Sequence, residues 1–369
     1  MIRVFEPDIG LRDKFSVLKA LNSNQISGTS DYIKDFENLV KEKFNREYAV
    51  AVSNGSVALD LALLNIEISN GDEVILPSFT IISCLSAVIR SGAKPVFCDV
   101  DKLSWNMTLE DIKPLVSKKT KAIIMVHTYG LTAEIAPIME YCSKKNIVII
   151  EDAAESHGQM YDKKYCGSFG KISTFSFYAN KHITTGEGGM VLTDDKKVYK
   201  NLLQMRNLDF TSEKRYYHNN LFWNYRLGSL QAALGISQLN KLEKTIQHKI
   251  IQGGYYIKLL SQYQDKFTLP LVKHKNVINN FWVFGLVLNN GDIRDKLIKK
   301  LYNKDIETRP FFFPLHLQPV LNQNNRKVLK VTENIARNGL YIPIGKHIDR
   351  KKQRHIVDNL VSSTQELLN

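Results

Sequence analysis

Residues 146–154 have the sequence NIVIIEDAA, a short run of β-branched apolar residues that ends at Asp152. A run that is apolar at every position predicts a strand covered on both faces, as central strands of parallel sheets are. Four further segments have the same character: DEVILPSF (72–79), PVFCDV (95–100), KAIIMVH (121–127) and ISTFSFY (172–178). The segments between these strands have helical patterns, at residues 57–64, 80–91, 108–116 and 134–145. Strands that alternate with helices predict an α/β fold with a largely parallel sheet, which binds ligands at the carboxyl ends of its strands.

The pattern changes at about residue 226. A long stretch follows with apolar residues at spacings of three and four, and it predicts a helix that links two domains. Beyond it we expect one strand and two helices, at 281–288, 292–305 and 349–367. The sequence therefore predicts a large α/β domain over residues 1–235, with an N-terminal lid segment. The bridging helix and a smaller α+β domain are expected over residues 236–369.

The composition is that of an ordinary globular protein, with 369 residues, 44% hydrophobic and 24% charged. No stretch approaches the roughly 18 consecutive apolar residues of a membrane span, and the first residues lack the apolar core of a secretory signal. We therefore expect a cytoplasmic protein that does not bind membranes. Its four cysteines have no CxxC spacing, which indicates buried reduced thiols and no bound metal.

The formal net charge is +13, which raises the question of nucleic acid. The basic residues are spread along the whole chain, however, and none lies in a recognisable nucleic-acid-binding motif. We interpret the charge as a lysine-rich solvated surface, with anionic small-molecule sites as a contributor, and expect no nucleic-acid partner.

Three features carry candidate chemistry. Asp152, at the end of a buried strand, either caps the next helix or is the counter-ion of a bound heterocycle, since a buried carboxylate is costly without a positive partner. Lys181 lies between a predicted strand and the turn GEGG (186–189). It is either a surface lysine or an amine of lowered pKa that can form a Schiff base. Residues 53–56, Ser-Asn-Gly-Ser, form a turn before a helix, and the free N–H groups there are either capped or bind an anion.

Together these features fit one cofactor, pyridoxal 5'-phosphate. The phosphate would lie on the turn at 54–57, the ring nitrogen would face Asp152, and Lys181 would capture the aldehyde. The sequence has no dinucleotide-binding glycine pattern, P-loop or metal-ligand cluster that would support a different assignment.

Motifs along nearly the whole chain resemble those of the DegT/DnrJ/EryC1/StrS family of sugar aminotransferases, which are fold-type I pyridoxal-phosphate enzymes. They occur in the family's order: SGTSDYIKDFE (27–37), AVSNGSVALDLAL (51–63), GDEVILPSFT (71–80), AKPVFCDVD (93–101), VHTYG (126–130), IEDAAESHG (150–158), GSFGKISTFSFYANKHITTGEGGMV (167–191), NYRLGSLQAALG (224–235) and RPFFFPLH (309–316). The segments FSFYANKHITTGEGG and RPFFFPLH are most similar to the branch that makes GDP-perosamine. The resemblance implies an aspartate-aminotransferase-like large domain with a mostly parallel central sheet and a smaller α+β domain at the C-terminus.

The resemblance also implies roles for individual residues. Lys181 would be the Schiff-base lysine and proton shuttle, Asp152 would pair with the ring nitrogen, and Glu155 would lie near the ring's phenolic oxygen. The phosphate would be held by Gly55, Ser56, Ser176 and, from the neighbouring subunit, Asn224. The role of Asn224 implies a homodimer with shared active sites.

Two positions bear on the reaction and its substrate. Some family members are dehydratases with histidine in place of the Schiff-base lysine, whereas this chain has Lys181 followed by His182, which favours transamination. After Pro77–Thr80 the family usually has an aromatic residue that stacks on the ring. Ile81 stands there in this chain, so the contact would be aliphatic and the substrate is left open.

Further residues are candidates for binding the substrate. Arg309 either binds a carboxylate or phosphate or forms a structural salt bridge, and His316 ends the same motif. A loop with cationic and aromatic side chains precedes the motif NYR, and related enzymes contact the sugar nucleotide with this loop. In this chain the loop either binds the nucleotide or is an ordinary solvated loop. Its residues are Lys214, Arg215, Tyr216, Tyr217 and His218.

We expect L-glutamate to donate the amino group and a GDP-linked 4-keto-6-deoxy sugar to accept it, for the synthesis of surface polysaccharide. The alternatives are the same reaction on a UDP- or dTDP-linked keto sugar or a small phosphorylated ketone, and a non-catalytic pyridoxal-phosphate-binding regulator.

Overall fold

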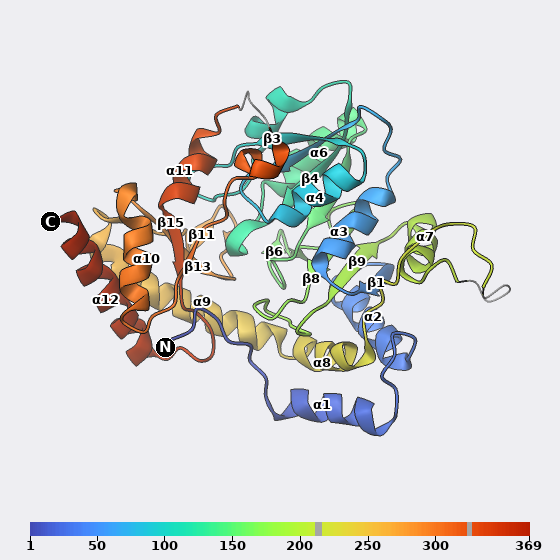
Figure 1. The fold of residues 1–369 in the computed structure, drawn as a ribbon, viewed down its shortest axis with the longest axis horizontal. Coiled ribbons are helices and arrows are strands. Elements are labelled where there is room, and N and C mark those ends of the chain that lie inside the picture. Colours follow the sequence, from blue (N-terminus) through green and yellow to red (C-terminus); the bar gives the residue numbers. More distant parts are fainter. Residues whose placement is uncertain (211–215, 323–326) are drawn as a thin grey trace.

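A seven-stranded sheet lies at the centre of the computed structural model, which describes residues 1–210, 216–322 and 327–369 (Figure 1). Its strand order is β1-β9-β8-β5-β4-β2-β3. The strands are β1 (Tyr48–Val52), β2 (Glu73–Pro77), β3 (Lys94–Cys98), β4 (Thr120–Val126), β5 (Val148–Asp152), β8 (Ile172–Ser176) and β9 (Gly189–Thr193). β9 is antiparallel to both of its neighbours, and all the other pairs are parallel. The predicted α/β fold with a mostly parallel sheet is confirmed, and the carboxyl ends of β1, β2, β5 and β8 lie along one edge.

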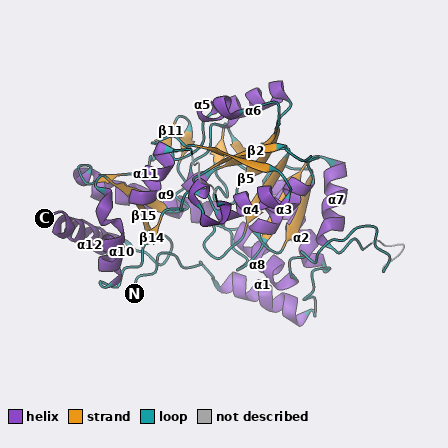
Figure 2. Ribbon diagram, turned by 45° about the horizontal axis from the view of Figure 1, so that its top comes forward, coloured by secondary structure: helices purple, strands orange, loops and turns teal. Residues whose placement is uncertain are grey.

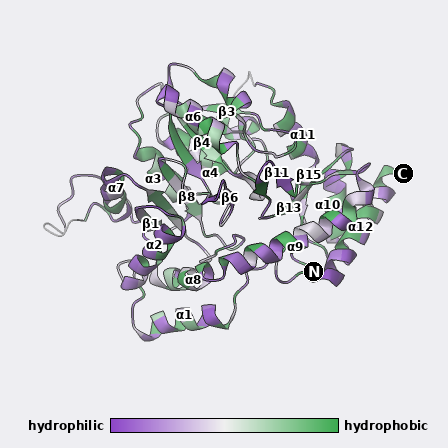
Figure 3. Ribbon diagram, turned by 180° about the vertical axis from the view of Figure 1, so that it is seen from behind, coloured by the Kyte–Doolittle hydropathy of each residue, from purple (hydrophilic) through white to green (hydrophobic). Residues whose placement is uncertain are grey.

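The inner strands are buried on both faces, as their unbroken apolar runs predict. Along β4, Ala122, Ile124 and Val126 pack with the helices α3 (Gly55–Leu64) and α4 (Ile82–Arg90). Ile123 and Met125 face the opposite side, where α2 (Asp31–Lys43) and α6 (Ile135–Lys145) cover the sheet. Figure 2 shows the strands enclosed between these helices, and Figure 3 shows that the strands are mostly hydrophobic while the helices mix both kinds of residue.

The predicted linking helix is two helices, α8 (Ser229–Leu239) and α9 (Leu242–Leu260), with a break at Asn240 and Lys241. The ammonium of Lys241 donates a hydrogen bond to Asp13 at 2.8 Å and lies 3.6 Å from Asp8. Lys241, at the break, thus holds the N-terminal segment beside α8 and α9. The helical pattern of the sequence does not indicate this contact.

A second sheet, β10-β13-β15-β14, packs against α9 and the last helices of the chain. Its strands are β10 (Phe267–Thr268), β13 (Phe284–Leu288), β14 (Arg309–Pro310) and β15 (Gly339–Ile342). The remaining helices are α1 (Leu11–Asn22), α5 (Leu109–Ile112), α7 (Lys196–Arg206), α10 (Arg294–Tyr302), α11 (Lys330–Asn338) and α12 (Arg350–Leu368). Two short hairpins complete the described strands: β6 (Met160–Tyr161) with β7 (Lys164–Tyr165), and β11 (Lys273–His274) with β12 (Val277–Ile278). The predicted domain boundary between residues 235 and 236 falls inside α8 and stays a prediction.

An aromatic cluster joins the central sheet to the second sheet. Phe79 follows β2, Tyr129 follows β4, and both pack against Phe311 beside β14. Trp105 and Trp282 belong to the same buried cluster. The cluster places Trp282, which comes late in the chain, close to the carboxyl edge of the central sheet.

Two expectations from composition can be compared with the structure. All four cysteines are buried and free, as predicted. Within the described ranges, no helix combines the length and the apolar character needed to cross a bilayer.

Glu151 anchors the turn that leads into β8. It precedes Asp152 on β5 and therefore points to the opposite face of the sheet. Its buried carboxylate accepts hydrogen bonds from His127 Nε2 at 3.0 Å and from Ser173 Oγ at 2.9 Å. Three backbone N–H groups, of Gly167, Phe169 and Gly170, also donate to it. Burial acts to raise the pKa of Glu151, but these donors lower it to about 2.

His127, Glu151 and Cys166 lie close enough together to hold a metal ion. Both oxygens of Glu151 already accept hydrogen bonds, so we assign the group a structural role. Burial acts to lower the pKa of His127, but Cys166 and Glu151 raise it to about 10.

We expect Glu151→Gln to lower the free energy of unfolding by about 3 kcal/mol, because it removes a buried carboxylate that five donors surround and turns an amide N–H toward some of them. Denaturation in urea would measure the change. Glu140→Gln, which removes an exposed carboxylate paired with Lys144, is the control and should leave the midpoint unchanged.

The pH dependence of this stabilisation follows from the two pKa shifts. The contribution of Glu151 is complete above its ordinary pKa of 4.5 and is lost as the pH falls toward 2. The contribution of His127 is complete below 6.5 and is lost as the pH rises through about 10. The difference between wild type and Glu151→Gln should therefore be largest between these ordinary values, and a difference that does not vary with pH would contradict the assignment.

Candidate active site

The carboxyl edge of the central sheet brings together the residues predicted to hold a phosphate. Gly55 opens α3 directly after β1, and Asn54 caps that helix by accepting a hydrogen bond from the Val57 N–H at 2.9 Å. Ser176 ends β8. A Cβ atom on Gly55 would lie 2.7 Å from the Cβ of Ser176, so only glycine lets the helix start approach this strand.

A second helix start adjoins the first. The hydroxyl of Ser56 lies 2.7 Å from the hydroxyl of Ser83, in the first turn of α4. Two helix N-termini with serine hydroxyls between them form an environment that favours a phosphate group, because their free N–H groups carry partial positive charge.

Asp152 lies at the carboxyl end of β5 and is 3% exposed. Its carboxylate accepts hydrogen bonds from the Ala154 N–H at 3.1 Å and from Cys84 Sγ at 3.3 Å. Burial raises the pKa of Asp152. Among the described residues no ion pair involves Asp152, so the carboxylate would be stabilised by a cationic group of a ligand.

Lys181 lies in the loop between β8 and β9, and its side chain is 9% exposed. Its own N–H donates to Tyr178 O at 2.9 Å, and the Ile183 N–H donates to His157 Nδ1 at 3.2 Å. These bonds fix the loop on both sides of the lysine. Burial lowers the pKa of Lys181, and the nearby carboxylates of Glu155 and Asp152 oppose this effect. The structure thus places a buried amine, not a surface lysine, beside Asp152.

Glu155 is the nearest carboxylate to this amine, with its Oε1 3.9 Å from Lys181 Nζ. It also accepts a hydrogen bond from the Tyr129 N–H at 3.1 Å. Burial raises the pKa of Glu155. The carboxyl group can therefore be protonated near neutral pH and donate a hydrogen bond to an oxygen of a ligand.

Ile81 and Asn224 are exposed in the single chain. Ile81 precedes α4 and is 40% exposed, at the edge where the serine hydroxyls meet. Asn224 pairs with Asn207 in an isolated bridge, and the Ser53 N–H donates to the carbonyl of the next residue, Tyr225, at 2.9 Å. The motif NYR therefore lies against the turn that precedes α3, with Asn224 at the surface.

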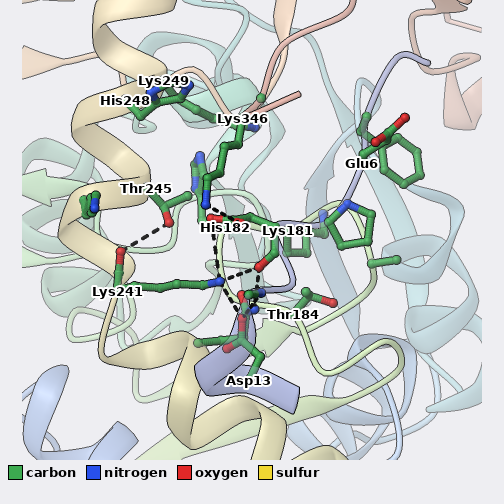
Figure 4. Close-up of a pocket in the computed structure, with 18 of the residues that line it drawn as sticks. Glu6, Asp13, Lys181, His182, Thr184, Lys241, Thr245, His248, Lys249 and Lys346 are labelled. Carbon is green, nitrogen blue, oxygen red and sulfur yellow. Dashed lines mark hydrogen bonds and ion pairs between the residues drawn. The ribbon is translucent and has the colours of Figure 1, made fainter. Parts of the chain in front are cut away.

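A cavity of about 700 Å³ adjoins Lys181, a volume suited to a small-molecule ligand (Figure 4). Its walls come from the N-terminal segment, the loop 179–184, the junction of α8 with α9, and residues 344–346. Cationic and imidazole side chains predominate among its charged and titratable residues, including Lys181, His182, Lys241, Lys244, His248, Lys249 and Lys346. Asp13 and Asp8 bind Lys241 and Lys346 at the N-terminal side.

Among the described residues, neither Arg309 nor His316 forms an ion pair or hydrogen bond with Lys181. Arg309 lies 3.3 Å from Glu307 and 5.0 Å from the ring of Phe5, which itself lines the cavity. His316 is buried, with Nδ1 2.6 Å from Ser78 Oγ and Nε2 3.2 Å from Glu333. Both assignments stay predictions.

The predicted nucleotide loop is only partly described. Lys214 and Arg215 lie outside the described residues. Tyr217 is exposed, and His218 bonds the carbonyl of Leu208 at 2.6 Å. Their roles likewise stay predictions.

Several residues of the site were not predicted. Ser83 and Cys84 lie in the predicted helix 80–91, and their position after a buried strand was the available signal. Trp282 lies with its ring centroid 3.7 Å from Lys181 Nζ, and the buried ammonium of Lys249 bonds the carbonyl of Trp282 at 2.7 Å. Neither residue is close in sequence to the other motifs, so no local pattern indicates them.

The residues present fit pyridoxal phosphate. The close approach of Gly55 to Ser176 brings the start of α3 next to the end of β8, and the buried Asp152 forms no ion pair with another described residue. Lys181 offers a buried amine to an aldehyde, and Glu155 lies within reach of the same amine.

Comparisons with known proteins agree with this geometry. The sequence pattern of the DegT/DnrJ/EryC1/StrS aminotransferase family matches residues 7–361. The GDP-perosamine synthase of Escherichia coli O157:H7 is 36% identical over 359 residues, which cover 97% of each chain.

Solved structures show the same fold. PseC, an aminotransferase of Helicobacter pylori, matches with a TM-score of 0.94 at 22% identity over 99% of each chain. A putative sugar aminotransferase of Streptococcus pneumoniae, in its PLP form, matches with a TM-score of 0.92 at 21% identity over 100% of each chain. The predicted aminotransferase fold and the predicted enzyme class are confirmed. The chain belongs to the DegT/DnrJ/EryC1/StrS aminotransferase family, whose chemistry implies pyridoxal phosphate as the cofactor.

Proposed function

We propose that this aminotransferase moves the amino group of L-glutamate to a GDP-linked 4-keto-6-deoxy sugar, with pyridoxal phosphate bound at the carboxyl edge of the central sheet. The observation that carries the site assignment is the buried amine of Lys181 beside the buried carboxylate of Asp152. When bound, the cofactor supplies an aldehyde that carries the amino group and a ring that withdraws electrons from the reacting carbon.

Lys181 is proposed to move the proton. Because burial lowers its pKa, a larger share of this amine is uncharged near neutral pH than for an exposed lysine. The uncharged amine can accept a proton from the α-carbon of the donor and, as an ammonium, pass it on within the same half-reaction; in the second half the transfer would run in reverse and leave a proton on the acceptor carbon. Asp152 would hold a proton at the ring nitrogen, and Glu155 would contact the phenolic oxygen.

The substrate assignment is supported by the similarity to the GDP-perosamine synthase of Escherichia coli across almost the full length of both chains. The cavity beside Lys181 has positively charged walls, which suits the pyrophosphate of a nucleotide-linked sugar. The 4-amino sugar would then serve polysaccharide synthesis in the cytoplasm.

Ile81 supports a second candidate acceptor. An aliphatic side chain where the family usually has an aromatic would change the contact with the cofactor ring, so a UDP- or dTDP-linked keto sugar or a small phosphorylated ketone is the second candidate. Rates with GDP-, UDP- and dTDP-linked 4-keto sugars, compared at equal concentration, would separate these acceptors.

A homodimer is also part of the proposal. Asn224 is exposed, so a neighbouring subunit could receive it beside its own phosphate site. Mixing a Lys181→Ala variant with an Asn224→Ala variant tests this, because a mixed dimer with shared sites regains one intact site and part of the activity.

The visible spectrum of the holoenzyme is the first test. Addition of excess L-glutamate should bleach the band of the lysine-bound cofactor as the amino group is transferred. A stable band would refute glutamate as the donor, and a protein that forms no band would refute the assignment of Lys181.

We expect Lys181→Arg to lower turnover by at least about 100-fold, the lower end of what a positioned general acid and base contributes. Arginine keeps the positive charge but does not give up its proton. Steady-state assays with L-glutamate measure the loss. Lys144→Arg, at an exposed position, is the matched control and should keep full activity. Substantial activity in Lys181→Arg would exclude the proposed acid–base role.

Asp152→Asn distinguishes a counter-ion from a helix cap. Asparagine can still accept the Ala154 hydrogen bond, so a cap would be preserved. Since burial raises the pKa of Asp152, loss of its charge should leave the melting temperature of the cofactor-free protein unchanged or higher.

The same variant should show a smaller gain in melting temperature on addition of pyridoxal phosphate, and its turnover should fall by about 100-fold or more. Thermal melts with and without the cofactor, together with assays, provide the comparison. Equal cofactor-dependent gains in wild type and variant would support the cap and not the counter-ion.

A further inference from the structure

Trp282 is the aromatic residue that contacts the amine of Lys181. Lys181 Nζ lies 3.7 Å from the centroid of the indole ring, and Trp282 is 5% exposed. The face of an indole ring attracts an ammonium group, most strongly where water is excluded. The contact therefore favours the charged form of the lysine without placing a full negative charge next to it.

Hydrogen bonds hold both the ring and the backbone of Trp282. Its Nε1 donates a hydrogen bond at 3.0 Å to the carbonyl of Asn180, the residue before Lys181. Its own carbonyl accepts a hydrogen bond from the Lys249 ammonium at 2.7 Å, which ties it to α9. The ring of Tyr129 packs beside it, with centroids 5.8 Å apart. The indole therefore cannot turn away from the lysine without breaking its hydrogen bond to Asn180.

Several titratable groups surround the same amine. Glu155, at 3.9 Å, and Asp152 favour its charged form. Three basic groups also interact with it electrostatically: His182, the next residue in the chain, and His157 and Lys249 from other segments. Burial lowers the pKa of each of these three, to about 3 for His157 and about 7 for Lys249. The two imidazoles are therefore uncharged at neutral pH, and the balance at the amine depends on the carboxylates, Lys249 and the indole.

We propose that Trp282 is a positioning residue that receives the ammonium of Lys181 whenever this lysine is not bonded to the cofactor. The inference rests on the proposed acid–base role of Lys181. A lysine that takes up a proton in a buried site needs a place to hold its charge. Close pairing with Glu155 alone would hold the proton too firmly, whereas the indole face supports the charge and leaves the proton transferable.

The test begins with the cofactor-free protein, so that its result does not depend on turnover. Reductive methylation with formaldehyde, followed by peptide mass spectrometry, gives the rate at Lys181 as a function of pH and hence its apparent pKa. Trp282→Leu removes the ring face, and Trp282→Phe keeps an aromatic face without the indole N–H. Trp105→Leu removes a buried indole from the same aromatic cluster and serves as the control.

Removal of the ring face should lower the apparent pKa of Lys181 by about 0.5 to 1.5 units in Trp282→Leu, because the ammonium loses its attraction to the ring. Trp282→Phe should show a smaller shift, and Trp105→Leu should show none. In the holoenzyme, Trp282→Leu should lower kcat about tenfold or more with little change in the KM for L-glutamate, and Trp282→Phe should restore part of it.

Equal pKa shifts in the Trp282→Leu and Trp105→Leu variants would show general damage to the cluster and overturn the proposal. An unchanged pKa in both Trp282 variants would also overturn it. If Trp282→Leu does not fold, the Trp282→Phe shift alone decides. Failure of the proposed acid–base role would give a different result. The Lys181→Arg variant would then stay active, independently of the pKa of Lys181 measured in the Trp282 variants.

Discussion

The common direction of β1, β2, β5 and β8 is the constraint on which the rest of the site depends. Parallel strands end at the same edge, so residues that are far apart in sequence meet there without a dedicated loop to carry each one. Gly55, Asp152 and Ser176 all occupy this edge. The antiparallel strand β9 then turns the chain back, and the return loop carries Lys181 to the same place.

Burial gives these groups their chemistry. An exposed lysine beside two carboxylates would form a solvated ion pair with ordinary pKa values. Here the protein interior acts against every charge, which lowers the pKa of Lys181 and raises those of Asp152 and Glu155. The three groups are consequently poised to exchange protons or to accept a charged ligand. Glu151, one residue from Asp152, has the opposite shift because five donors surround it. Two adjacent carboxylates of β5 thus have different roles on the two faces of the sheet: Glu151 stabilises the fold, and Asp152 belongs to the candidate site.

Much of this arrangement could be predicted from the sequence. The apolar runs that end at Pro77, Val126 and Asp152 are unambiguous, because a strand buried on both faces tolerates little else. The motifs around Gly55 and Lys181 each had a simpler interpretation, a capped helix and a surface lysine, and only together with Asp152 did they indicate one cofactor.

Other features could not be predicted. The edge strand β1 and the return strand β9 have sequences that fit several structures, and only their pairing with each other and with β8 defines them. The break at Asn240 lies in a continuous helical pattern and depends on a tertiary contact of Lys241. Trp282 reaches Lys181 through the aromatic cluster, and His316 bonds Ser78, across separations in sequence that no local pattern encodes.

The segments that form the cavity beside Lys181 limit when this part of the protein can fold during synthesis. They come from residues 5–13, from the middle of the chain and from residues 344–346. All strands of the central sheet, by contrast, have been synthesised once the ribosome has passed Thr193. A nascent chain can therefore fold its central sheet early, whereas residues 3–8 gain their contacts with residues 344–347 only when nearly the whole chain has emerged. The cavity wall is therefore incomplete until residues 344–346 have been synthesised, and a chain that ends before residue 344 lacks that part of it.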